Sequence, residues 1–64
     1  MTRDPRQEPR AGDVLSIGGK AILVLTAEGG SVHYACDGDR GERKLVEWRW
    51  LVKAAEVVHV AGAS

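Results

Sequence analysis

Residues 14–26 have the sequence Val-Leu-Ser-Ile-Gly-Gly-Lys-Ala-Ile-Leu-Val-Leu-Thr, and this stretch decides the fold class. Residues 14–17 have a short strand pattern, and Gly18-Gly19 can adopt the positive φ angles that a tight hairpin turn needs. Residues 21–26 are an apolar run without a polar residue at every second position, which predicts a strand covered on both faces. The sequence therefore predicts an antiparallel β-hairpin at the start of the fold.

The next predicted strand is residues 32–36, after a Gly-rich turn. Val32, Tyr34 and Cys36 fall on one side of this strand, and His33 falls on the other. This alternation is typical of a strand with one face toward a core.

Three further segments complete the pattern. Residues 37–41, Asp-Gly-Asp-Arg-Gly, are a dense cluster of turn formers and predict an exposed loop. Residues 42–46 can form a fourth strand with Leu45 facing inward, and residues 57–60 return to strand chemistry.

Residues 47–56 change from a period of two to the period of a helix. Trp48, Leu51, Val52 and Ala55 fall at i, i+3, i+4 and i+7, which is the spacing of one helical face. A helix of about two turns is marginal alone, so we expect packing to hold it in place.

This order of elements resembles that of SH3-like small barrels. The residues that carry the resemblance are 12–20, the hairpin of residues 21–34, and the ending from 48 to 60. The resemblance implies a mainly β fold: a small five-stranded SH3-like barrel with one short helix before the last strand. Closure of such a sheet removes the exposed edges of a lone meander.

The barrel is expected to form one domain over residues 13–60. Residues 1–12 are predicted to be a flexible N-terminal tail, because they contain two prolines, alternating charges and only one large apolar side chain, Met1. Such a segment buries too little surface to offset the entropy of ordering it. Residues 61–64 are expected to be a fraying C-terminal end.

Size, charge and cysteine content limit the function. Nine Lys and Arg balance nine Asp and Glu among 64 residues, whereas proteins that bind duplex DNA usually carry a basic surplus. Cys36 is the only cysteine, so a disulfide within the chain is excluded and the cytoplasm is the expected compartment. The longest apolar run, residues 21–25, falls far short of the roughly 20 residues of a membrane span. Because so small a core stabilises little, self-association as a homo-oligomer is a natural expectation.

The sequence predicts no metal site and no cofactor. His33, Cys36 and His59 are one ligand short of a closed zinc site, and the first two point to opposite faces of a strand. The glycine pairs at 18–19 and 29–30 lack the surrounding pattern of a phosphate-binding loop, and a strand follows each.

No catalytic set is predicted either. Cys36 with His33 or His59 is the only pair that could supply a nucleophile and a base. Some SH3-like barrels are enzymes that share a pore between subunits, notably the plasmid-borne type II dihydrofolate reductases, but this chain lacks their Val-Gln-Ile-Tyr signature. We expect a protein that is not an enzyme, with an oligomeric shared-pore enzyme as the alternative.

The expected binding surface centres on the second tryptophan. Trp50 lies about 200° around the helix from the inward Trp48, beside Lys53. Exposed tryptophan is enriched at binding hot spots. The predicted binding residues are Trp50, Arg49, Lys53 and Tyr34.

These features favour a small binding module, either a protein-interaction domain or an accessory or regulatory factor of the kind that phages and mobile elements encode. The alternative is a barrel associated with nucleic acid through aromatic stacking and arginine contacts. It requires the arginine-bearing tail to fold onto the same side as Tyr34, Arg49 and Trp50.

Overall fold

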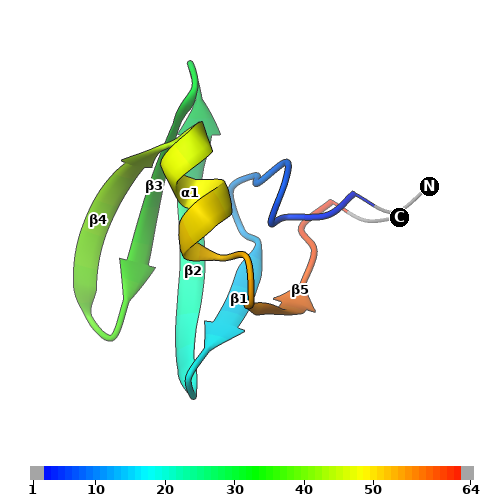
Figure 1. Ribbon diagram of the computed structural model, residues 1–64, viewed down its shortest axis with the longest axis vertical. Helices are drawn as coiled ribbons and strands as arrows, with labels where there is room; N and C mark the ends of the chain where they lie inside the picture. Colours follow the sequence, from blue (N-terminus) through cyan, green and yellow to red (C-terminus); the bar gives the residue numbers. More distant parts are fainter. Residues whose placement is uncertain (1–2, 63–64) are drawn as a thin grey trace.

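The computed structural model describes residues 3–62, which form a five-stranded antiparallel sheet and one helix (Figure 1). Residues 1, 2, 63 and 64 of the predicted end segments lie outside the described residues. The sheet has the order β4-β3-β2-β1-β5. The elements are β1 (Val14–Ile17), β2 (Lys20–Glu28), β3 (Ser31–Cys36), β4 (Asp39–Lys44), α1 (Leu45–Leu51) and β5 (Glu56–His59). The mainly β class, with five strands and a short helix before the last one, is confirmed.

The strands β4 and β5 lie at the two edges of the sheet. Each is hydrogen-bonded to one neighbour among the described residues, β4 to β3 and β5 to β1. The helix α1 packs against β3 and β4 (Figure 1). The resemblance to SH3-like barrels implied a sheet that closes into a barrel. Among the described residues, β4 and β5 are not paired with each other, so hydrogen bonds between these edge strands do not close the sheet.

Burial alternates along the first half of β2. Ile22 and Val24 are buried, whereas Leu23 between them is 41% exposed. The prediction of a strand covered on both faces is therefore wrong, because within residues 3–62 the packed layer covers the face with Ile22 and Val24 and leaves Leu23 exposed. The register with β3 shifts between Val24 and Thr26, so one extra residue bulges there and the next inward position moves to Ala27.

The turn between β3 and β4 is shorter than predicted. Asp37 and Gly38 both have positive φ angles, 55° and 85°, as a two-residue hairpin turn requires. The strand β4 begins at Asp39, so the predicted loop over residues 37–41 is wrong for its last three residues. Asp39 and Gly41 are turn formers by type, but the tight Asp37-Gly38 turn lets residues 39–41 pair with β3.

The helix begins earlier and ends earlier than predicted. The Lys44 backbone N–H donates a hydrogen bond to the Glu47 carboxylate at 3.2 Å, which satisfies a donor at the start of α1. The helix covers Leu45–Leu51, not residues 47–56. An acidic residue three positions into the helix thus accounts for the earlier start.

Trp48, Val52 and Ala55 are buried, as the periodicity predicts, but Leu51 is 41% exposed. The inward position of Leu51 is therefore a wrong prediction. Leu45 packs against the core from the first turn. The buried face of the helix is therefore formed by Leu45, Trp48 and Val52, and Leu51 lies at the edge of this face.

Tyr34 and Trp48 form the aromatic part of an otherwise aliphatic core. Their ring centroids are 5.6 Å apart and their planes are tilted by 48°. Gly41 on β4 lies opposite Tyr34, and a Cβ atom there would lie 2.6 Å from the tyrosine ring. The glycine is required by the close approach of this ring. The buried members of the core are Leu15, Ile22, Val24, Val32, Trp48, Val52 and Ala55.

Gly41→Ala should lower the free energy of unfolding by about 1–3 kcal/mol, because the added methyl group overlaps the Tyr34 ring. In a Tyr34→Val background the same change should be neutral or slightly stabilising, since alanine costs less backbone entropy than glycine. Urea unfolding of the four proteins measures both effects. Equal destabilisation in the two backgrounds would show that the ring is not the obstacle.

Candidate functional site

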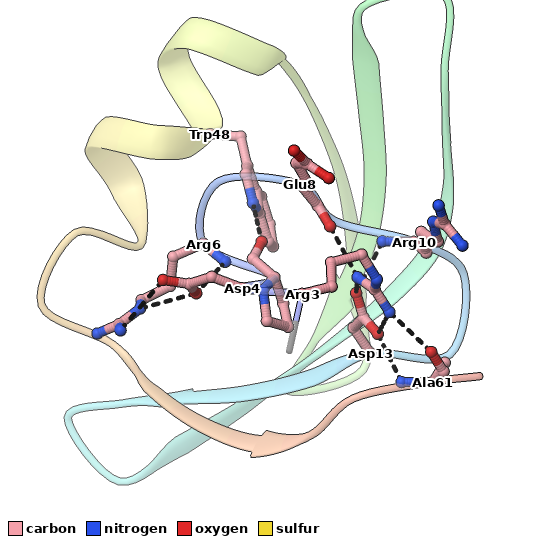
Figure 2. Close-up of polar contacts among 9 residues, drawn as sticks. Arg3, Asp4, Arg6, Glu8, Arg10, Asp13, Trp48 and Ala61 are labelled. Atoms are coloured by element: carbon pink, nitrogen blue, oxygen red, sulfur yellow. Dashed lines mark hydrogen bonds and ion pairs between the residues drawn. The ribbon is translucent and has the colours of Figure 1, made fainter. Parts of the chain in front are cut away.

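The N-terminal segment, residues 3–12, packs against the sheet and the helix. Pro5 and Pro9 are buried, and the Trp48 indole N–H donates a hydrogen bond to the Pro5 carbonyl at 3.0 Å (Figure 2). Arg6 donates to the Ala55 carbonyl at 3.3 Å. The prediction of a flexible tail over residues 1–12 rested on the few apolar side chains of the segment. It did not include these hydrogen bonds, because their partners lie far away in the sequence.

Asp13 is the centre of a buried polar cluster (Figure 2). The Arg3 guanidinium donates to both oxygens of its carboxylate, with a distance of 2.8 Å from Nη2 to Oδ1. The backbone N–H groups of Arg10 and Ala61 donate to the same carboxylate, each at 2.7 Å. Burial by itself raises the pKa of Asp13, but the hydrogen bonds and the charge of Arg3 outweigh it and hold that pKa below its usual value.

The Asp13 carboxylate is fully engaged by these contacts. Each of its oxygens accepts two hydrogen bonds, so it has no free position for a substrate or a transferable proton. Arg3 also donates to the carbonyls of Glu8 and Ala61, both at 2.7 Å. The cluster therefore joins the N-terminal segment to the start of β1 and to Ala61, which follows β5, and its role is structural.

A second ion pair lies in the same segment. The Arg6 guanidinium is 3.1 Å from the Asp4 carboxylate, and both side chains are about two-fifths exposed. The hydrogen bonds that Arg6 donates lower the pKa of Asp4. Two of the three arginines that the sequence placed in a free tail are thus engaged by carboxylates of the same chain.

A groove of about 220 Å³ lies between the N-terminal segment, the β2–β3 turn and the start of α1. Its buried lining residues are Pro9 and Val32, whereas its charged lining residues, Glu8, Glu28 and Arg49, are exposed. Small-molecule sites usually contain a few well-placed polar groups in a sheltered cavity. The lining residues include no fully buried polar side chain that could fix a ligand.

The structure does not group the possible metal ligands His33, Cys36 and His59 into one site. Among residues 3–62, no group of three or more His, Cys, Asp or Glu side chains is arranged to hold a metal ion. His33 is exposed, with Nε2 at 3.4 Å from the Glu42 carboxylate, while Cys36 packs against the core. Within the same range, no helix combines the length and the apolar character needed to cross a membrane.

Trp50 and Lys53 meet on the outside of the helix. The Trp50 side chain is 73% exposed, and the Lys53 ammonium lies 5.1 Å from the centroid of its ring. Val46, one turn earlier on the same side, is 60% exposed. With Arg49 these residues form the outer face of α1, and at about 100° per residue its three helical members lie within an arc of about 100°. This face is the candidate functional site.

The other two predicted binding residues differ in position. Arg49 is exposed beside Trp50, and its Nε–H donates to the Gln7 carbonyl at 3.2 Å. Tyr34 packs on Trp48 at the inner side of α1, so the structure does not bring it to Trp50. Val46 was not among the predicted binding residues, because residues 42–46 were expected to be a strand. Its i, i+4 spacing to Trp50 becomes apparent only when the helix starts at Leu45.

A comparison with protein-family models, curated proteins and solved structures finds no match for this chain. The site is therefore assigned on its geometry.

Asp13→Asn should lower the free energy of unfolding by about 3–5 kcal/mol, because it leaves the mostly buried Arg3 without its counter-charge. Asp4→Asn makes the same chemical change in a partly exposed pair and should cost about 1 kcal/mol or less. Chemical denaturation at pH 7 compares the two variants. Equally small losses would contradict a structural role for Asp13.

Stability should also fall in acid. The lowered pKa of Asp13 means that its ionised form contributes fully above the ordinary value of about 3.9, and that this contribution is lost as the pH falls through the lowered pKa. The pKa of Asp4 is also lowered, so protonation of Asp4 destabilises the fold in the same pH range. The loss of unfolding free energy in acid that remains in the Asp4→Asn variant therefore reports on Asp13. An NMR titration that placed the Asp13 carboxyl pKa at or above its ordinary value would contradict this expectation.

Proposed function

We propose that this chain is a small non-enzymatic protein-interaction module that binds a partner through the outer face of α1. The observation that carries the proposal is the contrast between two tryptophans on one short helix: Trp48 is fully buried, whereas Trp50 is 73% exposed. Tryptophan offers a large rigid contact area and is enriched among residues that dominate binding energy. An exposed one on an ordered helix fits such a role.

The surroundings of Trp50 support the proposal. Val46 extends its apolar surface, and Lys53 and Arg49 place polar groups at the margin. An apolar centre with a polar rim is the usual anatomy of a protein interface. Because Trp48 holds the helix against the core, the face is ordered before binding, which reduces the entropy cost of association.

The contacts of the N-terminal segment weigh against the nucleic-acid alternative. That alternative needs the arginines of the tail on the same side as Tyr34, Arg49 and Trp50. Arg49 does lie beside Trp50, but Arg3 and Arg6 are paired with carboxylates and Tyr34 packs on the core. A protein partner needs none of these groups. We therefore favour an accessory or regulatory protein, acting in the cytoplasm because its one thiol, Cys36, is free.

The test compares partner capture by wild type, Trp50→Ala and Val58→Ala. Val58 on β5 is 62% exposed and lies outside α1, so it is a matched control. We expect a protein from the source cells that wild type and Val58→Ala retain equally, and that Trp50→Ala retains at least about tenfold less, as for a hot-spot residue. Quantitative mass spectrometry of the captured proteins measures this.

Folding is checked on the same samples. Trp50→Ala should leave the free energy of unfolding within about 0.5 kcal/mol of wild type, because it removes an exposed side chain. If no protein were captured in a manner that depends on Trp50, the proposed function would be refuted.

A further inference from the structure

The outer face of α1 carries a local positive charge although the chain is neutral overall. Its charged members, Arg49 and Lys53, are both cations. The acidic residue of the same helix, Glu47, lies outside this arc, and its carboxylate accepts the hydrogen bond from the Lys44 backbone. The face itself therefore presents two cations and no anion, and exposed Glu8 and Glu28 lie across the groove that Arg49 also lines.

Among residues 3–62, neither of these two cations forms an ion pair. Arg49 donates to a backbone carbonyl, that of Gln7, and Lys53 lies over the Trp50 ring. The ion pairs of Lys and Arg with Asp and Glu in that range are made by Arg3, Arg6 and Lys20. A partner that supplies carboxylates here gains Coulomb attraction without first breaking an internal ion pair.

Between and beside the cations the face is apolar. Val46 and Trp50 are 60% and 73% exposed, and they lie one helical turn apart. We infer, resting on the proposed function, that the partner segment bound here is an acidic peptide with at least two carboxylates flanking an apolar side chain. The carboxylates pair with Arg49 and Lys53, and the apolar side chain packs on Val46 and Trp50.

Charge also decides between this occupant and a second copy of the chain. A two-fold contact places the same surface on both sides, so two copies meeting over this face would bring four cations, Arg49 and Lys53 of each, together without a carboxylate of the face between them. Like charges that face each other across an interface disfavour association. The self-association that the sequence suggested therefore does not suit this surface.

An acidic peptide is also favoured over single-stranded nucleic acid. Proteins that bind single strands usually combine a basic groove with several aromatic side chains for stacking. Here Trp50 is the one large aromatic on the face, and its neighbour Val46 is aliphatic. An aliphatic neighbour suits an apolar side chain better than a base.

The experiment selects peptides from a random dodecapeptide display library on the immobilised full-length chain, with Trp50→Ala as the counter-selection. We expect enriched peptides with a net charge of −2 or below and an apolar residue between the acidic ones. Their affinity should fall about five- to tenfold in Lys53→Gln and in Arg49→Gln, and should weaken as salt rises. Lys20→Gln removes an exposed cation that faces Asp37, outside α1, and should leave affinity unchanged.

The outcomes separate the two proposals. If no enriched peptide depends on Trp50 although the capture of a protein from the source cells does, this inference alone is overturned. If neither depends on Trp50, the proposed function fails and this inference fails with it. If peptides depend on Trp50 but are neutral or basic, or ignore Lys53→Gln, the inference alone is overturned. Binding of a twelve-residue oligothymidylate that Lys53→Gln abolishes, with no peptide enriched, would overturn it in favour of nucleic acid.

Discussion

The burial of Trp48 is the constraint on which the rest of this structure depends. Its side chain has no exposed surface, its ring lies 5.6 Å from that of Tyr34, and its indole N–H is satisfied by the Pro5 carbonyl at 3.0 Å. A buried indole needs such a partner, and here the partner comes from the N-terminal segment. The same contact fixes the rotation of α1 about its axis. Trp50, two residues on, must then point into solvent.

Much of the sheet could be predicted from the sequence, because local chemistry determines it. The Gly18-Gly19 turn sets the β1–β2 hairpin, and the alternation from Val32 to Cys36 matches the observed faces of β3. The exposure of Leu23 could not be predicted, because a short apolar run does not show whether a second layer covers the strand. The bounds of α1 were predicted wrongly because β4 ends at Lys44 and α1 begins at Leu45, with no turn residue between them. The hydrophobic pattern there does not show where the strand ends and the helix begins.

The buried cluster around Asp13 could not be predicted, for a different reason. Its partners Arg3 and Ala61 lie 10 and 48 positions away in the sequence, and no local pattern links them. Composition suggested that the N-terminal residues bury too little apolar surface to be ordered, but they are held by hydrogen bonds to groups already buried. In the candidate site, helical spacing alone predicted that Trp50 and Lys53 lie together. The sequence could not show that Tyr34 lies elsewhere, because that follows from the packing of its ring on Trp48.

The exchange of the two indole N–H protons with solvent, followed by NMR on the wild-type chain, tests the central claim most directly. The Trp48 proton is buried and hydrogen-bonded, so its exchange should require opening of the fold and be slowed by orders of magnitude. The Trp50 proton should exchange at the rate of a free indole. Similar rates for the two protons, or protection of Trp50 and not of Trp48, would contradict the account.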